Sequence, residues 1–165
     1  MPGISDLRMW MANTGTHRFA VREVFFRGRT GQLGYIALHT DGLFDHEDIL
    51  VPVSRFSPFD EGDLCLYLSD EEIRAAPGWA EGAEPDPRVD RLERVSHRIG
   101  AEVFGGDGPI GTLDDMRVSR VGYAITDLII SGRKVPYGRL RHMSEEGAHI
   151  VVNLDAAELA ALPGA

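Results

Sequence analysis

The chain has a single cysteine, Cys65, so it cannot form an internal disulfide or a metal site that needs several thiolates. We expect a reducing, cytoplasmic setting for such a sequence. No apolar run approaches the roughly 20 residues that a membrane helix requires. The apolar stretch at residues 9–11 is too short for the core of a signal peptide. The sequence therefore predicts a globular protein with no membrane span.

Basic residues are fewer than acidic ones. The chain has 17 Lys and Arg against 26 Asp and Glu, which gives a formal net charge of −9. Nucleic acids and anionic membrane surfaces attract basic patches, so we expect neither as a partner. The acidic balance mainly favours solubility. With 165 residues and 43% hydrophobic side chains, the chain can bury a core as one domain or as two small ones.

The sequence also lacks the common catalytic motifs. There is no Gly-x-Ser-x-Gly elbow, and neither glycine cluster, at residues 28–34 or 105–111, leads into the Lys-Ser/Thr of a phosphate-binding loop. Asp114 and Asp115 are adjacent on a predicted strand, where neighbouring side chains point to opposite faces. We expect no catalytic residues and no cofactor.

An internal repeat organises the chain. Three blocks recur in the same order: residues 64–78 at 150–164, residues 51–56 at 135–140, and Gly34-Tyr35 at Gly122-Tyr123. Such a recurrence predicts a tandem duplication. The stretch between the copies carries two prolines and three acids without apolar periodicity, as a linker does. We expect a first repeat at residues 4–79, a linker at 80–88 and a second repeat at 89–165.

Each repeat has mainly strand patterns and closes with a short helix. Alternating apolar positions are equivalent in the two copies: Leu64, Leu66 and Leu68, and Ile150, Val152 and Leu154. Such alternation marks a core-facing strand. Ser69 with Glu72, and Asp155 with Glu158, predict capping boxes at the starts of the two helices. Helices this short must pack on a sheet to be stable. The predicted fold class is mainly β with short helices.

The second repeat resembles the PRC-barrel domain family. The resembling segments are Ile99-Gly100-Ala101-Glu102-Val103, Ile110-Gly111-Thr112-Leu113-Asp114, Val135-Pro136-Tyr137 and the ending from Leu154 to Pro163. The family includes the cytoplasmic domain of the photosynthetic reaction-centre H subunit and the C-terminal domain of the ribosome maturation factor RimM. The resemblance implies a small β-barrel in each half and docking onto larger complexes. With the repeat, it predicts tandem barrels related by a pseudo-twofold axis.

One acid-rich segment, residues 39–48, has no counterpart of equal length in the second repeat, and we expect it to be four residues longer. The side chains that a metal ion would use there are His39, Asp41, Asp45 and His46, with Glu47 and Asp48 as further oxygen donors. The spacing fits no EF-hand, so we expect a solvated hairpin loop and no bound metal, with a metal site at these side chains as the alternative.

The same segment carries the candidate partner contact. Leu43 and Phe44 form an apolar pair framed by charged residues, a pattern typical of a protein-binding patch. The competing interpretation is that this pair folds back on its own half. We expect a non-catalytic interaction or assembly module, acting as a homo-oligomer or as a subunit of a complex whose partner the sequence does not identify. The alternative is a small-ligand or metal-binding protein, or an enzyme, with a cleft between the repeats.

Overall fold

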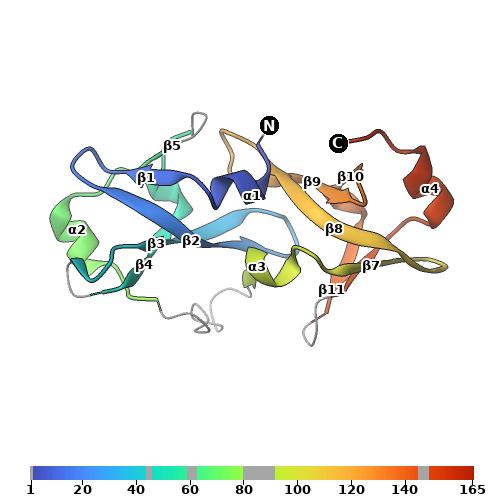
Figure 1. Cartoon of the computed structure of the whole chain (residues 1–165), viewed down its shortest axis with the longest axis horizontal. Coiled ribbons are helices and arrows are strands. Elements are labelled where there is room, and N and C mark those ends of the chain that lie inside the picture. Colours follow the sequence, from blue (N-terminus) through green and yellow to red (C-terminus); the bar gives the residue numbers. More distant parts are fainter. Residues whose placement is uncertain (1, 44–45, 59–62, 80–91, 145–148) are drawn as a thin grey trace.

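The computed structural model describes residues 2–43, 46–58, 63–79, 92–144 and 149–165 of the chain. The molecule is elongated, with one sheet in each half and short helices at its middle and its ends (Figure 1). Strands dominate, as the sequence predicts. No described helix combines the length and hydrophobicity needed to cross a membrane. The predicted linker at residues 80–88 lies outside the described residues.

The first sheet has the order β4-β3-β2-β1-β5, with β6 pairing with β2. Its strands are β1 (Met11–Asn13), β2 (Arg18–Arg27), β3 (Leu33–His39), β4 (Asp48–Pro52), β5 (Asp63–Cys65) and β6 (Leu92–Arg94). The accompanying helices are α1 (Ile4–Leu7), the 3₁₀ helix η2 (Val53–Arg55), α2 (Asp70–Ala75) and α3 (Val95–Arg98). The pair β1 and β5 is parallel, and the other pairs are antiparallel.

The second sheet repeats this succession, with the order β10-β9-β8-β7-β12-β11. Its strands are β7 (Glu102–Gly105), β8 (Gly108–Val118), β9 (Ile125–Ile130), β10 (Arg133–Pro136), β11 (Leu140–Met143) and β12 (Ile150–Val152), with the 3₁₀ helix η3 (Tyr137–Arg139) and α4 (Ala156–Ala161). The pair β7 and β12 is parallel, as β1 and β5 are. The fold is therefore mainly β, with two sheets and short helices.

The small closed barrels expected from the sequence are not found in the described part of the chain. The first sheet ends at β4 and β5, and the second ends at β10 and β11. A physical reason lies in Pro52 and Pro136, the last residues of β4 and β10. Proline has no N–H for a further ladder bond, and a 3₁₀ helix follows each proline. Each sheet therefore stays open.

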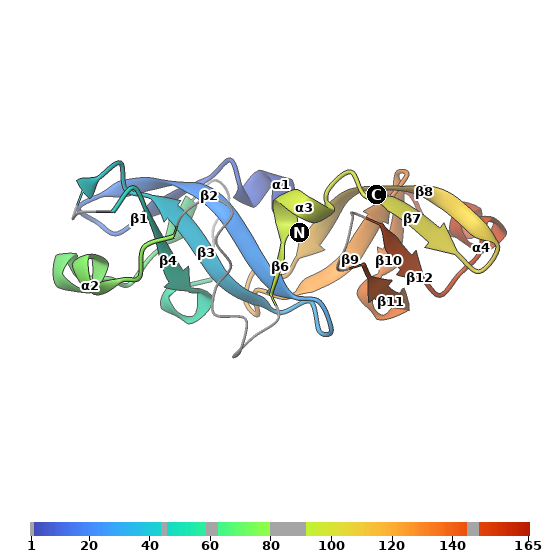
Figure 2. The same ribbon diagram turned by 90° about the horizontal axis from the view of Figure 1, so that it is seen from below.

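The segments that lead into the two halves cross over to the opposite sheet. Gly3 bridges to Arg117 of β8, and α1 packs on β8, while β6 pairs with β2 and α3 packs on β2. Both helices lie near the middle of the molecule in Figures 1 and 2. The sequence alone leaves residues 88–99 as a helix or an extended lead-in. Residues 88–91 lie outside the described residues, and the rest form β6 and then α3.

Matching hydrogen bonds hold the two crossovers. The N–H and hydroxyl of Ser5 donate to Asp115 of β8 at 3.1 and 3.0 Å. In the same way, the N–H of Ser96 donates to Glu23 of β2 at 3.1 Å, and the Ser96 hydroxyl also donates to Glu23. Glu23 is only 2% exposed. A buried carboxylate needs such donors, so these bonds fix each lead-in segment on the other half.

The registers of β3 and β9 correct one alignment made from the sequence. Tyr35 pairs with Pro52, whereas Asp127 pairs with Pro136. Tyr35 therefore corresponds to Asp127, and its match to Tyr123 is wrong. Residues 40–47 separate β3 from β4, but only Ser131 and Gly132 separate β9 from β10. The loop of the first half thus has eight residues against two in the second half, a larger difference than the four residues expected.

One hydrophobic core runs through both halves. It contains the residues that the sequence places on the core-facing strands: Leu64, Leu66, Ile150, Val152 and Leu154, with Leu68 packed at its edge. Both predicted capping boxes are confirmed. A smaller cluster of Phe25, Ala37, Leu50 and Trp79 covers part of the other face of the first sheet. The first sheet is therefore buried on both sides beside β4, the strand that carries the loop and the groove described below.

Candidate functional site

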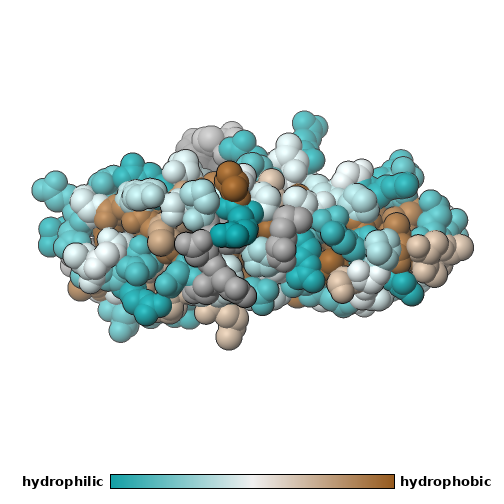
Figure 3. All heavy atoms as spheres, turned by 90° about the horizontal axis from the view of Figure 1, so that it is seen from above, coloured by the Kyte–Doolittle hydropathy of each residue, from teal (hydrophilic) through white to brown (hydrophobic). Residues whose placement is uncertain are grey.

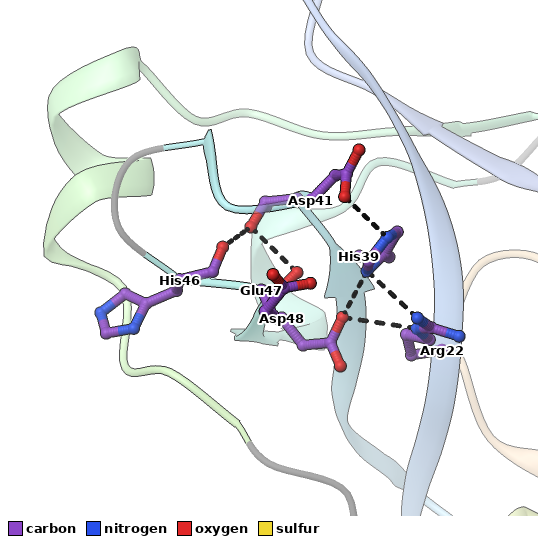
Figure 4. A network of polar contacts seen from close by, with 7 residues as sticks. Arg22, His39, Asp41, His46, Glu47 and Asp48 are labelled. Carbon is purple, nitrogen blue, oxygen red and sulfur yellow. Dashed lines mark hydrogen bonds and ion pairs between the residues drawn. The ribbon is translucent and has the colours of Figure 1, made fainter.

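Two features of the first half share strand β4. The first is a polar cluster where the loop of residues 40–47 joins β3 and β4 (Figure 4). The second is an apolar recess between β4, η2 and α2. Asp48 begins β4 and belongs to the cluster, while Leu50 and the rest of β4 line the recess. Both features therefore depend on the position of one short strand.

The polar cluster centres on His39 at the end of β3. Its Nδ1 lies 2.8 Å from Oδ1 of Asp48, and Arg22 Nε of β2 lies 3.4 Å from the same oxygen. On the other side of the ring, His39 Nε2 is 3.7 Å from Oδ1 of Asp41. The donor atoms of His39, Asp41 and Glu47 all lie within 4.8 Å of one another. One imidazole and two carboxylates therefore face a common point.

The loop backbone brings Asp41 and Glu47 together. Asp41 and Gly42 have φ values of 53° and 74°, in the left-handed region that Asp and Gly tolerate best. The N–H of Asp41 then donates to the carbonyl of Glu47 at 3.1 Å. Thr40 is buried, and its hydroxyl donates to the carbonyl of His46. The two carboxylates are thus placed by the turn of the loop and by bonds to its backbone.

The structure separates the candidate ligands proposed from the sequence. His39 and Asp41 lie together with Glu47. The His46 ring points away from them (Figure 4) and lies against Gly78. A Cβ atom added to Gly78 would be only 2.6 Å from Nδ1 of His46. Asp45 lies outside the described residues.

The candidate partner contact is described only in part. Leu43 is 41% exposed on the loop that joins β3 and β4. Phe44 lies outside the described residues. The exposure of Leu43 is compatible with a partner contact, and the pair stays a prediction.

The apolar recess has a volume of about 270 Å³. We call it the β4–α2 groove, and its lining residues are Leu50, Val51, Pro52, Arg55, Leu68, Glu72, Ala75, Ala76 and Pro77. Arg55 pairs with Glu72 at its rim and donates to the carbonyl of Tyr67 at 2.7 Å. The groove therefore has an apolar floor and a charged rim. Sequence reasoning missed it, although the repeated blocks contain most of its residues.

Local sequence explains why the groove stays open. Helix α2 begins at the Ser69–Glu72 capping box and buries Ile73 against the core. Ala75 and Ala76 follow, and their small side chains leave space beside β4. The chain then returns along β4, where the N–H of Leu50 donates to the carbonyl of Pro77 at 2.9 Å. Helix and strand are thus held a fixed distance apart with little side-chain volume between them.

The second half carries nearly the same residues in the same arrangement. The N–H of Lys134 donates to the carbonyl of Pro163 at 2.9 Å, as Leu50 donates to Pro77. The unchanged counterparts are Val135, Pro136, Arg139, Leu154, Glu158, Ala161 and Pro163. Two positions differ: Lys134 replaces Leu50, and Leu162 replaces Ala76. The larger Leu162 packs against the core of the second half, so the two halves differ where the groove would open.

A further recess of about 290 Å³ lies near the junction of the halves. Its lining residues all come from the first half: Arg27, Gln32, Leu33, Gly34, Tyr35, Pro52, Val53 and Ser54. On the face shown in Figure 3, hydrophobic side chains appear in separate stretches over both halves, with hydrophilic ones between them. An apolar contact on that face is therefore confined to short stretches.

Comparison with known proteins gives no family assignment. No protein-family model matches the chain. No curated protein shows significant similarity to it. The resemblance to PRC-barrel domains therefore rests on the short motifs in the sequence.

Proposed function

We propose that the chain is a non-catalytic interaction module that binds a partner protein through the β4–α2 groove, as a subunit of a larger complex in a reducing, cytoplasmic setting. The observation that carries this proposal is the groove itself. It is apolar, it has a volume of about 270 Å³, and its counterpart in the second half has Leu162 where the groove has Ala76. The smaller side chain at this position of the first half leaves space that a leucine would occupy, which favours a role in binding.

The proposal includes two PRC-barrel-like halves related by a pseudo-twofold axis. Its support is the reciprocity of the contacts between them. Ser5 bonds to Asp115 as Ser96 bonds to Glu23. At the centre, the N–H of Leu33 donates to the carbonyl of Tyr123 at 2.9 Å, and the N–H of Ile125 donates to the carbonyl of Gly31 at 2.8 Å. An axis between β3 and β9 relates each of these bonds to its partner.

The chemistry of the groove indicates its ligand. The floor is aliphatic, and the exposed first turn of α2 carries Asp70, Glu71 and Glu72. We infer a partner segment with an aliphatic side chain flanked by Lys or Arg. Burial of such a side chain contributes about 1.5–3 kcal/mol, and the flanking cations complement a chain of net charge −9. Leu43 and Phe44, on the loop before β4, are proposed as a further contact with the same partner.

A direct test uses peptides that contain one leucine between basic residues, measured by fluorescence anisotropy, with binding mapped by amide chemical shifts. We expect shifts at Leu50 to Pro52 and in α2. Ala76→Leu introduces the side chain of the second half and should weaken binding at least tenfold, about 1.4 kcal/mol. The control Ala160→Leu makes the same change on the exposed surface of α4 and should bind like the wild type. Unchanged binding by Ala76→Leu at unchanged thermal stability would reject the groove as the site.

A further inference from the structure

We propose that His39, Asp41 and Glu47 bind one divalent transition-metal ion, with Zn²⁺ as the best fit. This goes beyond the docking function and is independent of it. The donor set is one imidazole nitrogen and two carboxylate oxygens, within 4.8 Å of one another. Imidazole favours zinc and its neighbours over Mg²⁺ and Ca²⁺, which prefer oxygen alone. The exposed side leaves room for water as a fourth ligand.

The distances suit a single ion. Two ligands at about 2.1 Å from a tetrahedral zinc lie about 3.4 Å apart. His39 Nε2 and Asp41 Oδ1 are already 3.7 Å apart. Asp41 and Glu47 are exposed, so rotation of their side chains closes the remaining gap without disturbing the core. Because the backbone of Asp41 bonds to that of Glu47, the ion would join the two sides of one loop.

The histidine is held in the orientation that a metal ligand needs. Its Nδ1 lies 2.8 Å from the Asp48 carboxylate, which is only 12% exposed. A carboxylate that accepts the Nδ1 proton leaves the Nε2 lone pair free, as in many metal sites where a second carboxylate orients the histidine. That nitrogen faces Asp41. Asp48 is not one of the three ligands, and its ion pair with Arg22 at 3.4 Å offsets its charge.

The second half provides an internal comparison. There, Ser131 and Gly132 alone connect β9 to β10, so the ligand-bearing loop is missing. Among the described residues, the proposal therefore predicts a single metal site, which lies in the first half and binds one ion.

A calorimetric titration tests the proposal. The full chain is treated with a chelator, freed of it, and titrated with ZnCl₂. We expect one ion per chain, and X-ray absorption should show one imidazole with oxygen ligands and no sulfur. His39→Ala and Asp41→Asn should each weaken binding at least tenfold. Asp41 is 88% exposed at its side chain, so Asp41→Asn should keep the wild-type fold. Binding should also weaken in acidic solution, because protonated imidazole is no ligand.

His46→Ala is the matched control, because this ring is on the same loop and points away from the cluster (Figure 4). It should bind zinc like the wild type. If His46→Ala loses the ion while His39→Ala keeps it, or if the folded wild type takes up no zinc at 100 µM, the assignment is overturned. Mg²⁺ at the same concentration should produce no calorimetric signal, and a strong one would contradict the predicted selectivity.

Discussion

Two tyrosines of the second half donate hydrogen bonds into the first half. The Tyr137 hydroxyl donates to the carbonyl of Gly28 at 2.6 Å, and the Tyr123 hydroxyl donates to the carbonyl of Ser57. Burial raises the pKa of Tyr137, with a smaller effect of Glu93. Burial also raises the pKa of Tyr123, with a smaller effect of Cys65. Both phenols therefore stay protonated donors throughout the neutral range.

Tyr137→Phe should lower the free energy of unfolding by about 0.5–1.5 kcal/mol, because it removes a donor and leaves a carbonyl without it. Urea denaturation measures the effect. The matched control is Tyr67→Phe, since Tyr67 is 67% exposed and should tolerate the change. Equal stability of Tyr137→Phe and the wild type would show that this bond does not hold the halves together.

The same tyrosines predict that the folded state loses stability at alkaline pH. Their pKa values are higher in the folded state than in the unfolded state, so the unfolded chain loses these protons first. Stability should be unaffected below about pH 10 and should fall as the pH rises above it. Thermal unfolding from pH 8 to pH 11 measures this. The decline should be shallower in Tyr137→Phe, and a decline of equal slope would assign it to other groups.

At the residue scale, the sequence identified part of the polar cluster, although it predicted a solvated loop without a metal ion. His39, Asp41 and Glu47 were singled out by the density of donor types in one segment. It could not distinguish His39 from His46, because the direction of each ring depends on the left-handed backbone at Asp41 and Gly42. The partly buried partner of His39, Asp48, is visible in the sequence only as one more acid. Arg22 comes from another strand, and no local pattern indicates it.

Among the elements, α2 depends strongly on its N-cap side chain. It has six residues, too few to be stable in isolation. Its Ser69 side chain accepts from the N–H of Glu72, and Glu72 reaches back to Ser69. The cap therefore contributes much of what fixes one wall of the β4–α2 groove.

Ser69→Ala should lower stability by about 0.5–2 kcal/mol, as loss of an N-cap does. It should also increase amide hydrogen exchange in α2 and weaken peptide binding in the groove. The counterpart Asp155→Ala removes the equivalent cap of α4 and serves as the control. It should loosen α4 and leave the groove intact. Equal loss of binding in both variants would attribute the effect to global stability rather than to α2.

The elements that the sequence predicted well are those fixed by neighbours along the chain. Capping boxes and apolar alternation are local, and both are confirmed at Ser69, Asp155, Leu64 and Ile150. β6 was ambiguous because its strand form comes from pairing with β2, far away in sequence. The groove was missed because the alignment of Ala76 with Leu162 shows a smaller side chain, but not that the space beside β4 stays empty.

At the scale of the whole molecule, the crossover of the lead-in segments ties the halves together. Residues 2–7 contact the second sheet, and residues 92–98 contact the first. The repeated blocks predicted two similar halves in the right order. They could not predict the crossover, because an apolar lead-in segment can pack on either sheet. The arrangement of the two halves in space decides which sheet it contacts. The closed barrels came from the family resemblance, and the open edges at β4 and β10 correct them.

Because the core is continuous, a defect in one lead-in segment should destabilise both halves. Leu7 is fully buried in α1, which packs on β8. Leu7→Ala should therefore cost about 2–5 kcal/mol and should keep a single unfolding transition. Hydrogen exchange should increase in β8 and in β2 together, although Leu7 belongs to the first half by sequence. The control Met9→Ala changes a residue that is 84% exposed and should leave stability unchanged. Two separate transitions in Leu7→Ala, with only the second sheet losing protection, would show that each half folds on its own and that the shared core does not couple them.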